Sequence, residues 1–362
     1  MKERRKRNMS RTGLLFMFCL LMLCGCAQIT GFMENTEVSG REVESLAAEK
    51  KDDTVLLGGM PVGIYMETDG VLVLDTEKMT GMDGKEYTPA QGVVSSGDYI
   101  TEVNHQKIEG KKQLMDLVEH LDGEKVLLTV RRENTILEKK LTPVQISKGN
   151  YRLGIWVRDN VQGLGTITFL TKNNRFAALG HGIHDIDTST LLTIKRGTLY
   201  RTSIQKVQKG SKGNPGTMEG IIVYNRFHQL GVIEKNTDAG IYGELNSDRS
   251  WIGEEVPIQV AKKEEIKTGE ARIRCYIDGE VKEYTICITQ IDKESDQVNK
   301  GMVIQVTDTE LLEKTGGIIQ GMSGSPIIQN GKLIGAVTHV FVQDSTKGYG
   351  IFIENMLKEE ES

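Results

Sequence analysis

A serine flanked by glycines is the residue of this sequence best suited to covalent catalysis. Ser323 lies in the motif GMSGSP at 321–326, and a predicted tight hairpin with Asn-Gly at 330–331 follows it. Glycines let a substrate carbonyl approach the backbone, and the N–H groups of Gly321 and Ser323 can point at a developing oxyanion. The motif predicts a nucleophile at Ser323, with Ser325 as the second choice. The alternative interpretation of this motif is a Gly/Ser turn without a catalytic role.

A histidine between two glycines could take the proton of such a nucleophile. His181 follows the strand-like run at 176–179. Glycine neighbours offer it little side-chain packing, and an imidazole can act as a general base near pH 7. The segment also holds His184, Asp185 and Asp187, which could bind zinc, but no thiolate and no Glu-containing helix motif accompany them. We predict a general base at His181, no metal site and no cofactor.

The region that carries both motifs, residues 148–360, has the pattern of a β-rich domain. Short apolar runs alternate with Gly, Asn and Asp turns, for example at 165–170, 221–224, 272–277 and 334–342. This spacing predicts a sandwich or a pair of barrels, not βαβ units. Cys275 and Cys287 lie on either side of an Asp-Gly turn, and a simple hairpin does not place them opposite each other. We interpret them as small core residues, not as a disulfide.

Residues 56–145 have the pattern of a small α+β unit. Strand-like runs are interrupted by leucines with helical spacing, at Leu114, Leu117 and Leu121. The order of elements resembles a bacterial PDZ domain, a fold that binds an extended peptide as an added strand. A PDZ-shaped spacer without a ligand is the alternative.

The PDZ resemblance implies a particular ligand site. It places the carboxylate-binding loop at Gly63, Ile64, Tyr65 and Met66. The backbone N–H groups of such a loop capture a terminal carboxylate. The expected ligand is therefore a peptide or a C-terminus, and a segment of the chain itself is favoured by its high effective concentration.

The first 55 residues are predicted to lie outside both domains. Residues 1–26 join a basic start to an apolar run from Leu14 to Cys24, which has signal-peptide length and is short for a spanning helix. The run ends in Leu-Cys-Gly-Cys, which resembles a lipobox with Cys26 as the lipidated residue. A cleaved signal, a lipid anchor and a retained anchor stay open, and each implies export. We predict that residues 27–55 form a polar linker.

Composition narrows the possible partners and domain count. The chain has 362 residues, which predicts two to three domains. Its 45 Lys and Arg residues against 50 Asp and Glu residues give a net charge of −5, and nucleic-acid binding needs a basic face. The 38% hydrophobic content is enough for real cores. We therefore expect a folded protein that binds no nucleic acid.

The two catalytic motifs together resemble the chymotrypsin-like serine peptidases, whose fold is a double β-barrel. Met322 stands where those enzymes usually have an acid, so activation by a buried new N-terminal amine is not expected. With its signal segment, its PDZ domain ahead of the peptidase and its closing Gly-Tyr-Gly at 348–350, the chain is similar to the stage IV sporulation protein B (SpoIVB) peptidase family. That family is the secreted serine peptidase of the sigma-K checkpoint in endospore-forming bacteria.

The resemblance also implies an acid that fixes the tautomer of the histidine. The family's pattern places it just before the serine, at Asp308. From the residues alone, the same segment is a capping box, Thr307-x-x-Glu310, that begins a short helix. Asp185, Asp187 and Asp238 stay open as alternative acids.

The function implied by the resemblance is regulatory proteolysis. The peptidase would be secreted from the forespore into the space between two membranes, and would process itself. It would then cleave a membrane-bound inhibitor complex containing a protein like stage IV sporulation protein FA, so that pro-sigma-K is processed. The PDZ domain would hold the protease in check or dock its substrate. The rival hypothesis is a non-catalytic, peptide-binding PDZ lipoprotein on an inactive peptidase scaffold.

Overall fold

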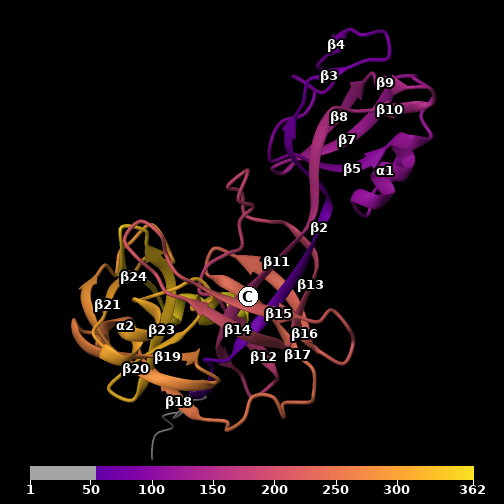
Figure 1. Cartoon of the computed structure of the whole chain (residues 1–362). Helices are drawn as coiled ribbons and strands as arrows, with labels where there is room; N and C mark the ends of the chain where they lie inside the picture. Colours follow the sequence, from indigo (N-terminus) through magenta and orange to yellow (C-terminus); the bar gives the residue numbers. More distant parts are fainter. Residues whose placement is uncertain (1–53) are drawn as a thin grey trace, which may run out of the picture. The chain divides into compact units, whose positions relative to one another are not determined.

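The computed structural model describes residues 54–362 (Figure 1). The predicted export segment at 1–26, with Cys26, and nearly all of the linker lie outside the described residues. Within 54–362, no helix is both long and apolar enough to cross a membrane.

Six antiparallel strands close into a first barrel. In the order of their pairing they are β2 (Pro61–Thr76), β11 (Ile155–Leu170), β12 (Arg175–Ala178), β17 (Gly240–Leu245), β16 (Gln229–Thr237) and β13 (Ile194–Tyr200), which pairs again with β2. Alternate residues of the strands point inward, so Val62, Ile64 and Met66 of β2 are almost fully buried. These side chains join Ile167, Phe176 and others in one core cluster.

A second barrel forms from the C-terminal part of the chain, drawn in orange and yellow in Figure 1. Its pairing order is β19 (Gly269–Ile277), β20 (Glu280–Ile291), β21 (Met302–Val306), β24 (Asp344–Phe352), β23 (Lys332–Phe341) and β22 (Pro326–Gln329), which returns to β19. Short strands connect the barrels, because β1 (Thr54–Leu57) pairs with β11 and with β18 (Pro257–Val260), and β18 pairs with β23. The predicted double β-barrel is confirmed.

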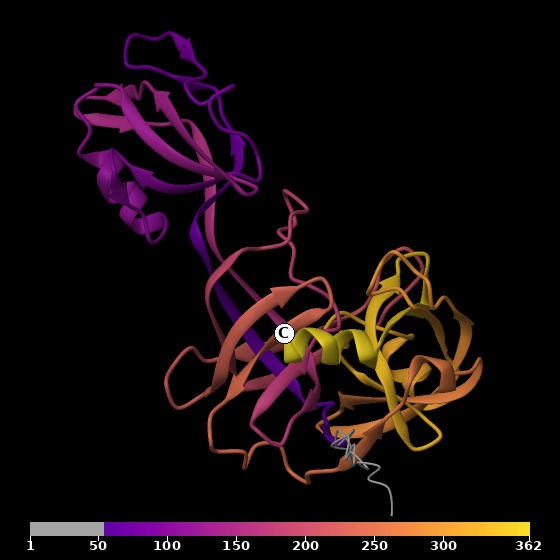
Figure 2. The same cartoon turned by 180° about the vertical axis from the view of Figure 1, so that it is seen from behind.

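Smaller elements complete the second barrel and its surroundings. Helix α2 (Thr309–Thr315) precedes the loop 321–325 that contains Ser323, called the nucleophile loop below. Helix α3 (Ile353–Glu361), the yellow helix of Figure 2, is the last element. Ile353 and Met356 of α3 are fully buried against residues of both barrels, including Phe169 and Ala336. The hairpin of β14 (Thr202–Gln208) and β15 (Thr217–Ile222) is inserted between β13 and β16.

The small α+β unit is an insertion between β2 and β11, which corrects the prediction that it precedes the peptidase. Both strands have 16 residues, and the second half of β2 pairs with the first half of β11. Val71 and Leu72 of β2 also pair with β5 (Tyr99–Val103). Strands β7 (Val126–Arg132) and β8 (Thr135–Leu141) extend this sheet, and α1 (Lys111–Glu119) packs against it through the buried Leu114. The remaining short strands are β3 (Met79–Thr80), β4 (Glu86–Tyr87), β6 (Gln106–Lys107), β9 (Val144–Ser147) and β10 (Asn150–Arg152).

The proposed carboxylate-binding loop at Gly63, Ile64, Tyr65 and Met66 is wrong. These residues lie in the first half of β2, where Gly63 pairs with Leu164 on one side and Tyr200 on the other. A carboxylate-binding loop needs unpaired N–H groups, and a strand with a partner on each side offers none. A groove in the inserted unit lies elsewhere, between α1 and residues 150–155.

Of the two cysteines interpreted as core residues, Cys275 is one, whereas Cys287 is only partly buried and lies outside the core. Strands β19 and β20 form a hairpin in which Cys275 pairs with Lys282 and Cys287 pairs with Glu270. Both thiols are free, and Cys275 is buried in the core of the second barrel.

Candidate active site

The structure brings Ser323 and His181 to one cleft of about 340 Å³. His181 follows β12 of the first barrel, and Ser323 precedes β22 of the second. The cleft is also lined by Thr338, His339 and Val340 of β23. Because strand ends from both barrels meet there, barrel closure positions residues that lie 142 positions apart (323 − 181).

The nucleophile loop has a backbone that only glycine adopts easily. Gly321 and Gly324 have φ angles of 103° and 93°. A Cβ on Gly324 would lie 2.1 Å from the carbonyl oxygen of Thr166, so this position has no room for a side chain. Hydrogen bonds from β11 hold the loop, since Thr166 N donates to Ser323 O (2.9 Å) and Thr166 Oγ1 donates to Gly321 O (2.8 Å). Thr168 Oγ1 donates to Gly324 O (2.8 Å).

Two N–H groups of this loop remain available to a ligand. In the described part of the chain, the N–H groups of Gly321 and Ser323 donate to no hydrogen bond. The preceding residue is fixed by the β14–β15 hairpin, because Met218 N donates to Gln320 O (2.9 Å) and Gln320 N donates to Gly216 O (2.8 Å). This clamp sets the plane of the peptide that carries the Gly321 N–H.

The two serines of the motif have different surroundings. Ser325 is completely buried, and its hydroxyl has no partner among the described residues. Ser323 is half-buried in the cleft, and its Oγ donates to Thr338 O at 2.9 Å. A substrate can therefore reach Ser323 but not Ser325. One neutral hydrogen bond of about 1 kcal/mol holds the Ser323 hydroxyl in this orientation.

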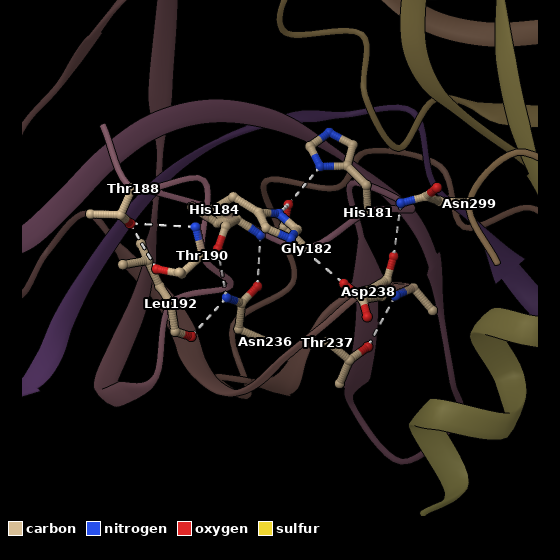
Figure 3. Close-up of polar contacts among 12 residues, drawn as sticks. His181, Gly182, His184, Thr188, Thr190, Leu192, Asn236, Thr237, Asp238 and Asn299 are labelled. Carbon is tan, nitrogen blue, oxygen red and sulfur yellow. Dashed lines mark hydrogen bonds and ion pairs between the residues drawn. The ribbon is translucent and has the colours of Figure 1, made fainter. Parts of the chain in front are cut away.

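The geometry of His181 suits a general base. Its Nδ1 lies 2.8 Å from Gly182 O, so this nitrogen carries the proton and Nε2 is left to accept one (Figure 3). Burial lowers the pKa of His181 below its ordinary value, and the neighbouring His184 acts in the same direction. The ring stacks on His339 with centroids 4.6 Å apart. Burial lowers the pKa of His339 to about 4, so both rings are neutral near pH 7.

Asp308 does not accompany His181. It is the N-cap of α2, where Oδ1 accepts from Leu311 N (3.1 Å) and Oδ2 accepts from Thr285 N (3.2 Å). Among residues 54–362, no hydrogen bond joins Asp308 to a histidine. The sequence predicted the start of a short helix here, but its capping box placed the N-cap one residue too early, at Thr307, whose Oγ1 instead donates to Thr285 O. The predicted position of Asp308 beside the base is wrong.

The other three acids are engaged in different ways. Asp185 is buried and Asp187 is exposed, and both accept from the guanidinium of Arg158, at 2.6 and 2.9 Å. Asp238 instead approaches the histidine segment, with Oδ1 3.6 Å from Nε2 of His184. Nδ1 of His184 lies 3.2 Å from Gly182 O, the same carbonyl that His181 contacts (Figure 3). Among the candidate acids in residues 54–362, Asp238 is thus the one whose ion-pair partner is a histidine of this segment.

Barrel closure explains why Asp238 is there. It lies in the turn between β16 and β17, and β17 pairs with β12 through Ile241 and Ala178. The turn therefore lies at the end of β12 from which His181 emerges. Backbone contact is close, since a Cβ on Gly182 would lie 2.6 Å from Thr237 O.

Two asparagines that the sequence analysis missed brace this region. Asn236 accepts from Ile183 N (2.8 Å) and donates to the carbonyls of Ile183 and Leu192 (Figure 3). Asn299 donates to Asp238 O (3.3 Å), and its own carbonyl accepts from Thr338 Oγ1 (2.8 Å). Asn299 therefore bridges the turn of the first barrel to the β23 strand beside Ser323. No sequence motif marks either residue, because their roles depend on pairing between distant strands.

No metal-binding cluster accompanies the site in residues 54–362. No group of three His, Cys, Asp or Glu side chains gathers there as ligands. His184, Asp185 and Asp187, which the sequence suggested as a zinc alternative, are divided between contacts to Asp238 and to Arg158.

Two closed barrels, a histidine after a strand of the first and a glycine-flanked serine before a hairpin of the second define the scaffold of a chymotrypsin-like serine peptidase. The sequence profile of a family described as "SpoIVB peptidase S55" matches residues 149–357. The chain belongs to this family of sporulation-type serine peptidases.

Other known proteins are similar over part of the chain. A protein of Helicobacter pylori (strain J99) named as a zinc metalloprotease is 28% identical over 180 residues, which are 43% of this chain. The chain spans about half the length, 50%, of this curated relative. The PDZ domain of an SdrC-like protein from Listeria monocytogenes covers 25% of this chain and 87% of its own, with 24% identity and a TM-score of 0.20.

Solved proteases are also similar to the chain. The active form of the Rv3671c protease of M. tuberculosis is 14% identical, with a TM-score of 0.30, over 56% of this chain and 75% of its own. The HtrA-type protease AlgW, solved with a decapeptide, is 12% identical, with a TM-score of 0.33, over 57% of this chain and 53% of its own.

Proposed function

We propose that the chain is an active serine endopeptidase, in which Ser323 Oγ attacks the carbonyl carbon of the scissile bond. Nε2 of His181 accepts the hydroxyl proton, while its Nδ1–H stays on Gly182 O. The N–H groups of Gly321 and Ser323 hold the oxyanion. His181 then protonates the leaving amine, and a water molecule hydrolyses the acyl-enzyme by the same steps. The observation that carries this proposal is that Ser323, His181 and two unengaged N–H groups share one cleft.

We assign the role of the acid to Asp238 in place of Asp308. A protonated His181 needs a nearby negative charge, and a carboxylate in the turn after β16 is connected to it through His184 and Gly182 O. Asp308 is occupied by two backbone N–H groups at the start of α2. Asp238→Asn is expected to lower kcat by about 100-fold or more, and Asp308→Asn is expected to leave it nearly unchanged.

Membership in the SpoIVB family supports the regulatory role as a proposal. The peptidase would be exported, would cleave its own chain, and would then cleave a membrane-bound inhibitor complex containing a protein like stage IV sporulation protein FA. Pro-sigma-K processing would follow. Export rests on the basic and apolar pattern of residues 1–26, where a cleaved signal, a retained anchor and lipidation of Cys26 are distinct outcomes.

The inserted unit is proposed to bind a peptide. Its groove is lined by the helix residues Leu114, Met115 and Val118 and by Leu153 to Ile155. Apolar side chains on one wall and extended backbone on the other suit an added peptide strand. The occupant would be a segment of the chain itself or of the membrane-bound substrate, and the complex would control when the peptidase acts.

A rival function is a non-catalytic peptide-binding scaffold. It is favoured by one observation, the hydrogen bond of Ser323 Oγ to Thr338 O in place of His181. Self-cleavage separates the two functions. The purified full chain should shorten with time, and Ser323→Ala should stay intact unless active protein is added. A Ser323→Ala chain that shortens at the wild-type rate when incubated alone would overturn the proposed function.

A further inference from the structure

Among residues 54–362, no charged side chain lines the cleft around Ser323. Its lining from the first barrel includes Leu164 and Leu179, and its lining from the second includes Ile318, Ile319 and Val340. The polar members are two glutamines, Ser323, Thr338 and two histidines, and burial keeps both histidines neutral near pH 7. A charged substrate residue would therefore lose its water without gaining an ion partner, which is strongly unfavourable.

The position of the substrate residue before the scissile bond follows from the oxyanion donors. Its carbonyl oxygen must reach the N–H groups of Gly321 and Ser323, so the residue lies between the segment 318–320 and strand β23 at 338–340. Thr338 O, which now accepts from Ser323 Oγ, is a backbone acceptor for the same extended substrate. The side chain of that residue meets Ile318, Ile319 and Val340.

Ile318 limits the depth of this pocket. Val340 pairs with Gly348 of β24, and an added Cβ on Gly348 would lie 2.7 Å from Cδ1 of Ile318 and 2.5 Å from His339 O. The isoleucine thus fills the space above the glycine, which a long substrate side chain would need. Ile318 is almost fully buried and belongs to the core of the second barrel, so it has little freedom to move aside.

We infer that the peptidase cleaves after a small apolar residue, such as alanine or valine, and that Ile318 sets this size limit. This inference rests on the proposed function. A pocket of this kind discriminates by about 10- to 200-fold for each methylene it gains or loses. A charged residue at this position is expected to lower kcat/KM by at least about 100-fold, which corresponds to ~2.7 kcal/mol.

Cleavage of a peptide series tests the inference with the full chain. The peptides share one sequence and differ only before the scissile bond, with Ala, Val, Leu, Phe, Lys or Glu. We expect the highest kcat/KM for Ala and Val, a value at least 10-fold lower for Phe, and values at least 100-fold lower for Lys and Glu. Ser323-dependent cleavage of the Lys or Glu peptide within 10-fold of the Val peptide would overturn the inference.

Variants assign the size limit to its residue. Ile318→Ala should raise kcat/KM for Leu and Phe relative to Ala by at least 10-fold. Ile304→Ala is the matched control, because Ile304 is a fully buried isoleucine of the same core outside the cleft. If Ile318→Ala does not fold, Val340→Ala opens the opposite wall and should shift the preference the same way. An equal shift in Ile304→Ala, or no shift in the folded cleft variants, contradicts the role of Ile318.

A binding measurement separates this inference from the proposed function. Ser323→Ala cannot form an acyl-enzyme, so the anisotropy of fluorescent versions of the six peptides reports binding alone. The same order of affinities, with Val and Ala ahead of Lys and Glu, supports the pocket even if the wild-type chain cleaves nothing, and then only the proposed activity fails. Equal affinities for all six peptides, or preference for a charged residue, overturn the pocket.

Discussion

Asp308 provides the sharpest test of how the site is assembled. Asp308→Asn keeps one side-chain oxygen, which can still accept from Leu311 N at the start of α2, and asparagine is a good N-cap. The bond from Thr285 N to the second carboxylate oxygen is lost, because an NH₂ group replaces the acceptor. One lost hydrogen bond to a charged group predicts a decrease of about 1.5–3 kcal/mol in the free energy of unfolding.

That loss converts to a modest change in melting temperature. At about 2–4 °C for each kcal/mol, a decrease of ~3–12 °C in the midpoint is expected. Because Asp308 has no hydrogen bond to His181 or His184 and is held by Thr285 N and Leu311 N, kcat/KM for a peptide substrate at 25 °C should change by less than about 3-fold. Differential scanning calorimetry and peptide cleavage measure the two quantities on the same preparation.

The reasoning would be refuted by the opposite pattern. A decrease in kcat of about 1000-fold or more with an unchanged melting temperature would make Asp308 the triad acid. Asp238→Asn is the comparison variant, since Asp238 is exposed and lies beside His184. It should lower kcat strongly with little change in melting temperature.

Three further perturbations probe the base, the nucleophile loop and the inserted groove. Because burial lowers the pKa of His181, its neutral form persists in acid, and the acid limb of kcat/KM should have a midpoint below pH 6.5; a midpoint at or above 6.5 would contradict the assignment. Thr166→Val removes the hydroxyl that binds Gly321 O and should lower kcat about 10-fold with little change in KM, whereas Thr198→Val, a buried threonine of the same barrel, should not. Met115→Lys at the groove should weaken binding of a captured peptide at least 10-fold and leave generic peptide cleavage unchanged; an equal effect of Met82→Lys, at an exposed methionine outside that groove, would count against it.

Local patterns in the sequence predicted the features that depend on neighbouring residues. The Asn330-Gly331 turn has φ angles of 52° and 73° and joins paired strands at Gln329 and Lys332, as the motif indicated. The alternating apolar runs predicted the β-rich fold, and the glycines marked where backbone segments approach closely. His181 and Ser323 could be proposed because each lies in a short motif.

Pairing between strands far apart in the chain could not be predicted from local sequence patterns. The run at 61–66 has apolar side chains at alternate positions, Val62, Ile64 and Met66, which fits a barrel strand as well as the edge of a PDZ domain. Which one forms depends on partners about 100 and 135 residues away, in β11 and β13. The insertion of the α+β unit within a strand pair, and not before it, follows from the same pairing.

The choice between Asp308 and Asp238 shows most clearly what the sequence could not predict. Asp308 is explained by its own helix, whose start was visible in the sequence although the motif placed the N-cap one residue too early, at Thr307. The approach of Asp238 to His184 depends on the closure of β12 against β17, which brings together a turn and a strand end about 55 residues apart. Nothing in the residues around Asp238 signals this contact.

The central claim, that Ser323 is an activated nucleophile, is tested most directly by labelling the full chain with a fluorophosphonate and measuring its intact mass. The structure predicts one adduct, located on Ser323 by peptide mapping. The adduct should be absent in Ser323→Ala and His181→Ala and retained in folded Ser325→Ala, because Ser325 is buried away from the cleft. No adduct on the folded wild-type chain, or an undiminished adduct in Ser323→Ala, would contradict the account.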